Sequence, residues 1–206
     1  MFALRHILSI ALAVASVQLI QAQEFRLSGG YNGSNVTGNG SDAWTGQAGY
    51  QFGADLVLGG RWFLKPGVHF LVRNLEYSYA TTAGEGPPMT TANEFRYTSR
   101  ALLVPVMLGV HLIDTAEQPG LNLYALGGPS ALMNLSADLD NDALEVTATQ
   151  TQWYLGFGAG AELGFLFVEG GYDVAMNNVF KGESLGTDPR VNFVRAQAGV
   201  RLKLAR

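Results

Sequence analysis

The sequence predicts an all-β protein, an eight-stranded antiparallel up-and-down transmembrane β-barrel. Three observations support this fold class. Apolar and polar residues alternate with a period of two along eight segments, an apolar leader begins the chain, and no later apolar run has the ~20 residues that a membrane-spanning helix needs. A membrane protein without such helices has to be a closed barrel, because lipid cannot satisfy the hydrogen bonds of an open sheet edge.

Residues 1–22 have the features of a secretory signal peptide. A short basic start precedes an apolar run that is too short to span a membrane, and Ala22 supplies a small residue before Gln23. We therefore expect cleavage between Ala22 and Gln23 and export through the inner membrane. Residues 23–206 then form a single barrel domain.

Composition excludes several classes of protein. The chain contains no cysteine, so disulfide frameworks and thiolate metal sites are excluded. Its net charge of −4 argues against nucleic-acid binding. Aromatic residues make up 11% of the chain, which is unlike a disordered protein.

The first three alternating segments place charged residues between apolar ones. Arg26 lies in the first segment, Asp55 in the second, and Lys65 and Arg73 in the third. A Gly-Gly pair between the second and third segments predicts a tight hairpin turn. These segments are residues 24–33, 44–58 and 61–79.

The fourth and fifth segments, residues 94–112 and 121–134, are less polar. Leucine and valine alternate at the end of the fourth, opposite Met107 and His111. Glycine and proline in residues 80–93 predict that this stretch is not strand throughout.

The last three segments, residues 152–164, 165–177 and 191–205, again carry charges on one face. These charged residues are Glu162, Glu169, Asp173, Arg195, Arg201 and Lys203. Long connections (residues 34–43, 80–93, 135–151 and 178–190) alternate with short ones, as in outer-membrane barrels with short periplasmic turns and long outer loops.

Several motifs resemble the outer-membrane β-barrel domain family that includes the PorT-like proteins. They are the leader ending in Ala22-Gln23, Leu103-Val104-Pro105-Val106, the stretch 124–130 (YALGGPS), the stretch 158–162 (GAGAE) and Glu169-Gly170-Gly171-Tyr172. The resemblance covers residues 23–205 and implies an eight-stranded barrel in the outer membrane, often of unassigned function. One kind of protein in this family assists a secretion system, but no residue of this chain allows that role to be assigned to it. Such barrels commonly end in an aromatic residue, whereas this chain ends in Leu202-Lys203-Leu204-Ala205-Arg206.

The polar faces are expected to form an ionic network that fills the lumen. An eight-stranded barrel is just wide enough for side chains to fill it, and charges inside have to pair. In a simple hairpin register Glu169 lies near Arg201, and Asp173 lies near Gln197 and Arg195. The expected network comprises Arg26, Asp55, Lys65, Arg73, Glu162, Glu169, Asp173, Arg195, Arg201 and Lys203. A pore or a ligand cavity is the alternative.

Other candidate sites are weaker. His69 and His111 offer only two ligands, fewer than a zinc site needs, so we expect no metal and no cofactor. Four acids at Asp138, Asp140, Asp142 and Glu145 lack the glycine and the bidentate glutamate of a calcium loop. Asn-x-Ser/Thr sequences in the loops are interpreted as turn residues. No local nucleophile motif such as Gly-x-Ser-x-Gly is present, so no enzyme is expected.

The sequence thus predicts a monomeric, non-enzymatic outer-membrane barrel with a structural role, or one that is adhesive or binds a protein or glycan through its long loops. Outer-membrane lipid is the partner expected for the apolar face. No nucleic-acid partner is expected. One alternative is a soluble lipocalin-like barrel, in which the apolar face points inward toward an apolar ligand. A small channel is the other.

Overall fold

A computed structural model of the chain describes residues 22–37, 44–83, 89–113, 120–139, 147–148, 151–177, 180–181 and 190–204. Its strands are β1 (Ala22–Thr37), β2 (Trp44–Gly59), β3 (Trp62–Ala83), β4 (Met89–His111), β5 (Leu121–Leu139), β6 (Thr147–Ala148), β7 (Thr151–Leu163), β8 (Leu166–Ala175), β9 (Phe180–Lys181) and β10 (Arg190–Lys203). In this part of the chain, no helix has the length and apolar character needed to cross a membrane. The predicted leader, residues 1–21, lies outside the described residues.

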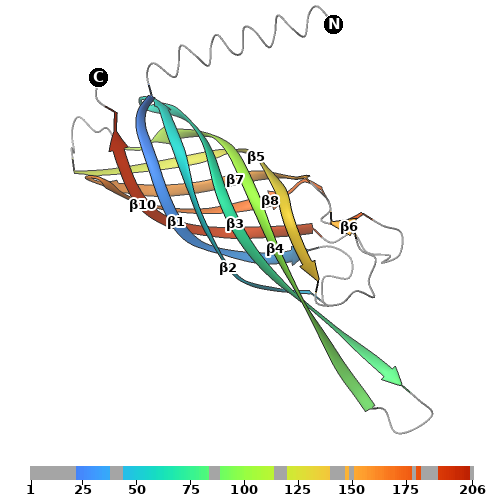
Figure 1. Ribbon diagram of the computed structural model, residues 1–206. Coiled ribbons are helices and arrows are strands. Elements are labelled where there is room, and N and C mark those ends of the chain that lie inside the picture. The colour runs from blue at the N-terminus through green and yellow to red at the C-terminus, as the bar shows by residue number, and fades with distance from the viewer. Residues whose placement is uncertain are drawn as a thin grey trace, which may run out of the picture.

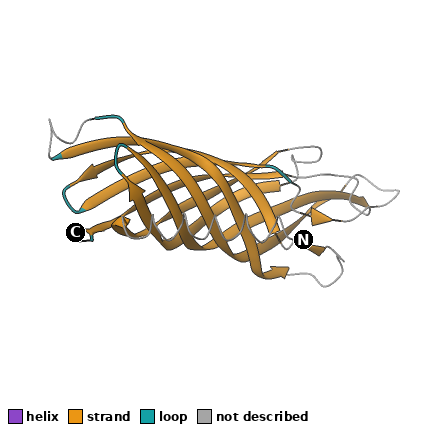
Figure 2. Ribbon diagram, turned by 90° about the horizontal axis from the view of Figure 1, so that it is seen from above, coloured by secondary structure: helices purple, strands orange, loops and turns teal. Residues whose placement is uncertain are grey.

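Eight of the described strands close into one barrel, in the order β1-β10-β8-β7-β5-β4-β3-β2 (Figures 1 and 2). Neighbouring strands are antiparallel throughout, including β1 and β10, which close the barrel. The predicted eight-stranded antiparallel up-and-down barrel is therefore confirmed. The short strands β6 and β9, which the sequence did not predict, pair with each other in a separate sheet.

The two ends of the barrel differ. At one end, here called the short-turn end, residues 60–61 join β2 to β3 and residues 164–165 join β7 to β8. Gly59 and Gly164 have φ angles of 127° and 60° at these turns, a backbone conformation that glycine adopts at little cost. β4 ends and β5 begins at the short-turn end too, because Trp62 pairs with Val110 and the Leu112 N–H donates to the Leu123 carbonyl oxygen. The opposite end, here called the loop end, carries the connections from β1 to β2, from β3 to β4, from β5 to β7 and from β8 to β10.

The strands at the loop end are longer than predicted. β3 and β4 pair as far as Ala83 opposite Met89, so most of residues 80–93 is strand rather than loop. The proline pair of that stretch falls in residues 84–88, outside the described residues, and leaves the ladder uninterrupted. β5 likewise extends through Asp138 to Leu139, where the sequence predicted a loop.

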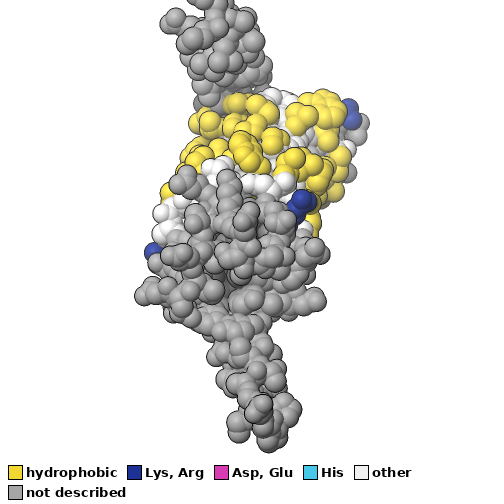
Figure 3. All heavy atoms as spheres, turned by 90° about the vertical axis from the view of Figure 1, so that its right-hand side faces the viewer, with side chains coloured by type: hydrophobic (Ala, Val, Ile, Leu, Met, Phe, Trp, Pro, Cys, Tyr) yellow, Lys and Arg dark blue, Asp and Glu magenta, His cyan; other side chains and the backbone are white. Residues whose placement is uncertain are grey.

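The apolar face of the barrel points outward. Trp62, Phe157 and Phe165 are each more than half exposed, whereas Arg26, Lys65 and Asp173 are buried inside. On the face shown in Figure 3, hydrophobic side chains form a broad band with lysine and arginine side chains at its margins. The lipocalin-like alternative needed the opposite arrangement and is wrong for this chain.

The lumen also contains two apolar clusters that the sequence did not predict. The cluster nearer the loop end comprises Leu71, Ala101, Leu103, Leu132, Tyr154, Ala175 and Phe193. The cluster nearer the short-turn end comprises Val57, Phe63, Met107, Tyr124 and Leu126. Inward-facing glycines make room for the large rings: a Cβ atom at Gly109 would meet the Phe63 ring, and one at Gly160 would meet Tyr124.

Candidate functional site: the filled lumen and the loop-end ribbon

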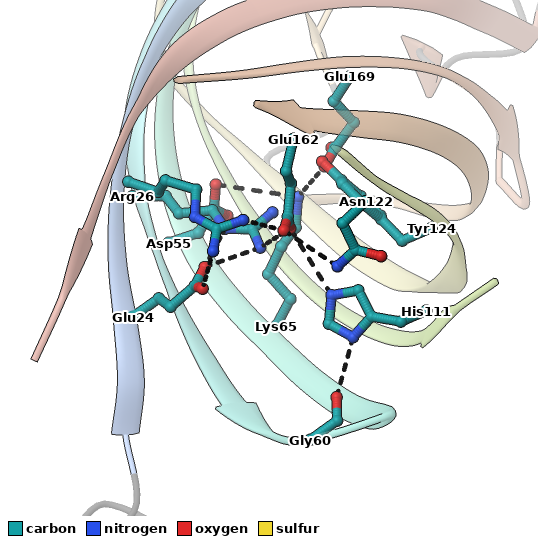
Figure 4. A network of polar contacts seen from close by, with 11 residues as sticks. Glu24, Arg26, Asp55, Gly60, Lys65, His111, Asn122, Tyr124, Glu162 and Glu169 are labelled. Atoms are coloured by element: carbon teal, nitrogen blue, oxygen red, sulfur yellow. Dashed lines mark hydrogen bonds and ion pairs between the residues drawn. The ribbon is translucent and has the colours of Figure 1, made fainter. Parts of the chain in front are cut away.

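Two arginines and two glutamates form a ring inside the short-turn end (Figure 4). Arg26 Nη2 lies 2.5 Å from Glu162 Oε1 and 3.0 Å from Glu24 Oε2. Arg201 Nη2 lies 2.8 Å from Glu24 Oε1, and Nη1 of Arg201 contacts the second oxygen of Glu162. Arg26 and Arg201 are direct cross-strand neighbours, a repulsive pairing that the two carboxylates offset.

Two further side chains complete this ring. Asn122 Nδ2 donates to Glu162 Oε2 over 3.2 Å. His111 Nδ1 lies 2.9 Å from the Gly60 carbonyl oxygen, and its Nε2 lies 3.7 Å from Glu162 Oε1. The ring therefore links the β2–β3 turn to strands β1, β4, β5, β7 and β10 at the mouth of the barrel.

Glu169 is the centre of a second network in the middle of the lumen. Its Oε2 atom lies 2.5 Å from Lys65 Nζ and accepts a hydrogen bond from Tyr124 Oη over 2.9 Å. Its Oε1 atom accepts from Gln197 Nε2 over 3.0 Å, and Gln51 Nε2 donates in turn to Gln197 Oε1. Since β3 and β8 lie on opposite sides of the barrel, the Lys65–Glu169 ion pair spans the lumen.

Three more contacts between buried side chains lie close to this network. His69 Nε2 lies 2.9 Å from Asp55 Oδ1, and Lys65 Nζ lies 4.0 Å from Asp55 Oδ2. Arg195 Nε lies 2.5 Å from Asp173 Oδ2. Each of these five side chains is at most 5% exposed, so all three contacts are buried.

Arg73 lies toward the loop end and differs from the other buried cations. Its Nη1 atom donates to Gln152 Oε1 over 3.3 Å and to Tyr154 Oη over 3.2 Å. Tyr154 Oη also donates to Gln152 Oε1 over 2.7 Å. Arg73 therefore reaches from β3 to β7 across the lumen, but its partners are neutral.

Eight of the ten charged residues predicted for the lumen are buried there, and Arg201 is half-buried at the mouth. Lys203 was expected inside but is exposed, because it lies at the last residue of β10, where the strand leaves the barrel. The predicted proximity of Glu169 and Arg201 was wrong: Glu169 lies opposite Gln197. The connection between β8 and β10 is long, and a long loop does not set strand register as a tight turn does. Asp173 does lie beside Arg195, as expected.

The two histidines do not meet. His69 binds Asp55 in the middle of the lumen, whereas His111 lies at the short-turn mouth. Among the described residues there is no group of three histidines or acids that could hold a metal ion. Of the acidic loop, Asp138 belongs to β5, and Asp140, Asp142 and Glu145 lie outside the described residues.

Sequence reasoning missed five side chains that contact the predicted charges: Glu24, Asn122, Tyr124, Gln152 and Tyr154. Glu24 stands two residues before Arg26, and Gln152 and Tyr154 share a strand face with Glu162, so attention to polar residues at even spacings would have found these three. Asn122 and Tyr124 lie on β5, which carries no predicted charge, so no such spacing signals them.

The second candidate site is the β3–β4 ribbon, defined here as residues 78–83 and 89–96. β2 pairs with β3 only as far as Tyr77, and β5 pairs with β4 only as far as Tyr97. Beyond those residues β3 and β4 pair with each other alone among the described strands. Figure 1 shows this ribbon projecting well past the barrel at the loop end.

The sequence match to known proteins agrees with this architecture. The family model "Outer membrane protein beta-barrel domain" matches residues 7–202. The chain belongs to this family. The apolar outer face of this outer-membrane barrel is thus its lipid-facing surface, and the charged face lines its interior.

The chain is also similar to several solved structures. Ail, the attachment invasion locus protein of Yersinia pestis, was solved with the heparin analogue sucrose octasulfate; it is 14% identical, with 87% of this chain and 99% of that chain covered and a TM-score of 0.45. Neisserial surface protein A is 11% identical, with 87% and 97% covered and a TM-score of 0.45. The N-terminal barrel domain of Pseudomonas aeruginosa OprF is 10% identical, with 87% and 98% covered and a TM-score of 0.40. No curated protein matches the chain.

Proposed function

We propose that this outer-membrane barrel is a non-enzymatic surface protein that binds an extended segment of a protein partner through the β3–β4 ribbon. The support is that ion pairs and apolar clusters of the described residues occupy its interior. Function is therefore placed at the loop end, which faces the outside of the cell in barrels of this class.

The observation that carries the proposal is the pair of open edges on the ribbon. Among the described strands, each strand of the ribbon has a pairing partner on one side only, so its other side offers N–H and C=O groups that no described strand pairs. An extended peptide adds to such an edge as a further strand.

The composition of the ribbon supports this role. Natural edge strands are usually protected by lysine, proline or inward charges, but the ribbon contains no lysine and no proline. Its two charged residues are Glu94 and Arg96, at the end of the second strand that adjoins the barrel. Over residues 78–83 and 89–93 the edges therefore lack the usual barriers to strand addition.

A sulfated glycan fits the loop end less well. The chain has a net charge of −4, and the sequence from Asp138 to Glu145 contains four of its acids. A polyanion would be repelled by this charge, whereas strand addition uses backbone groups and is insensitive to it.

The test uses the protein in nanodiscs and an array of extended peptides rich in threonine, valine and tyrosine, with immobilised heparin as a second probe. In one variant residues 79–82 and 90–93 are deleted together, which removes four paired residues from each strand and keeps the register. Binding to the peptide array should fall at least tenfold in this variant. Thr81→Ala with Thr91→Ala, which keeps every backbone group, should bind as the wild type does. Heparin binding without peptide binding would refute the proposal.

We also propose that the leader is cleaved after Ala22 and that the protein is delivered to the outer membrane. The support is the basic start and short apolar run of residues 1–22. Mass spectrometry of the outer-membrane fraction should find an N-terminus at or near Gln23. Intact chains beginning at Met1 in the inner membrane would contradict this.

A further inference from the structure

Arg73 is a buried cation for which the described residues supply no carboxylate. Its side chain is 1% exposed, and none of the ion pairs within 4.0 Å among the described residues involves it. Nη1 has two neutral acceptors, but Nε and Nη2 have no hydrogen-bond partner. Leaving such a charge buried and unmatched costs several kcal/mol.

A third unused donor comes from the side chain that Arg73 contacts. Gln152 is fully buried, and its Oε1 atom already accepts from Arg73 and from Tyr154. The Nε2 atom of Gln152 has no partner. Arg73 and Gln152 thus contribute three orphan hydrogen-bond donors, and guanidinium has no acceptor to offer in return.

The other lumen cations leave no carboxylate over for Arg73. Glu24 and Glu162 are held by Arg26 and Arg201. Glu169 is held by Lys65, Asp173 by Arg195, and Asp55 lies between His69 and Lys65. The charge of Arg73 therefore has to be matched by something other than these acids.

We propose that Arg73 and Gln152 bind a small monovalent anion of the chloride class in the loop half of the lumen. An anion only accepts hydrogen bonds, so it can satisfy unpartnered donors of these two adjacent side chains and neutralise the guanidinium at once. A water molecule would supply no charge and would bring two hydrogens that need acceptors of their own.

Position and packing restrict the size of the anion. Arg73 lies opposite Ser99 on the loop side of Leu71, whose apolar cluster fills the lumen toward the short-turn end. The anion consequently enters from the loop end and stops at that cluster. Since Arg73, Ser99 and Gln152 are all at most 1% exposed, a halide fits better than a phosphate or a sugar acid.

The experiment measures chloride binding to the protein folded in phosphatidylcholine vesicles. Line broadening of ³⁵Cl in nuclear magnetic resonance reports binding directly, and urea unfolding in sodium chloride or sodium gluconate at equal ionic strength reports its effect on stability. At four times the Kd, chloride should raise the folded-to-unfolded ratio about fivefold. Both effects should vanish in Arg73→Gln and persist in Arg61→Gln, which removes an exposed arginine of the β2–β3 turn.

Gln152→Glu keeps the proposal testable if Arg73→Gln does not fold. It places a carboxylate beside Arg73 as an internal counterion, so the barrel should fold and lose its response to chloride. Equal stability of the wild type in chloride and gluconate, without line broadening, would mean that water fills the site and would overturn the proposal. A chloride response that survives Gln152→Glu or Arg73→Gln would place the ion elsewhere and would overturn it too.

Discussion

How much a charged side chain contributes to the stability of this barrel depends on its position along its strand. Lys65 and Lys203 both lie on the polar face of a strand, but Lys65 is buried against Glu169 and Lys203 is exposed at a strand end. The two lysines thus provide a comparison in which residue type is constant and position differs.

Lys65→Met should lower the free energy of unfolding by about 3–5 kcal/mol, because it leaves the Glu169 carboxylate buried without its cation. Lys203→Met should change it by less than about 0.5 kcal/mol, as is usual for exposed positions. Urea unfolding in lipid vesicles measures both.

The double variant Lys65→Met with Glu169→Leu separates pairing from packing. Replacing both members of a buried pair by apolar residues is often neutral, so much of the lost stability should return. A double variant no more stable than Lys65→Met would show that Glu169 matters through Gln197 and Tyr124 instead.

Individual strands combine a lipid-facing row and a lumen-facing row, and β7 shows both. Its outward residues include Phe157, near its middle, and its inward residues include Glu162 and Gln152. This alternation could be predicted from the sequence because it depends only on the geometry of one strand.

Arginine on the outward row should be costly in proportion to its depth in the bilayer. Phe157→Arg should lower the free energy of unfolding by about 2–4 kcal/mol, and Phe165→Arg, at the short turn after β7, by about 0–1 kcal/mol. The two variants remove the same side chain. Equal losses in vesicles would argue that lipid does not cover the middle of β7.

The inward row is limited by space as well as charge. A Cβ atom at Gly109 would meet the Phe63 ring, so Gly109→Val should displace this ring and cost about 1–3 kcal/mol. Gly120→Val is the control, because a Cβ atom there meets nothing within 4 Å. A smaller loss at Gly109 than at Gly120 would mean that the Phe63 side of the lumen is loosely packed.

In the whole molecule, side chains from opposite walls of the barrel contact one another across its interior. The Lys65–Glu169 pair joins opposite walls, and the ring of Glu24, Arg26, Glu162 and Arg201 closes the short-turn mouth. Apolar clusters lie between the polar groups. This layering follows from the small diameter of an eight-stranded barrel, whose lumen side chains can fill.

A barrel filled in this way should not conduct ions. Reconstituted in planar bilayers, the protein should give no stable, sizeable conductance. Steady ion-selective openings that change with Glu169→Gln or with Arg201→Gln would show that the lumen is a channel and would contradict the closed interior.

The sequence by itself determined the eight strands and the face of each strand on which the charges lie. Both follow from a period-two pattern that is local to each segment. Only the tertiary structure decided that the charged face points inward, because a period of two is the same for either orientation. It also decided that Glu169 binds Lys65 rather than Arg201, that β3 and β4 project beyond their neighbours, and that the partners of Arg73 among the described residues are neutral. These features depend on strand register and on contacts across the lumen between strands that are not neighbours. Neither leaves a trace in local periodicity, because register is set by pairing between distant segments and lumen contacts by the closure of the barrel.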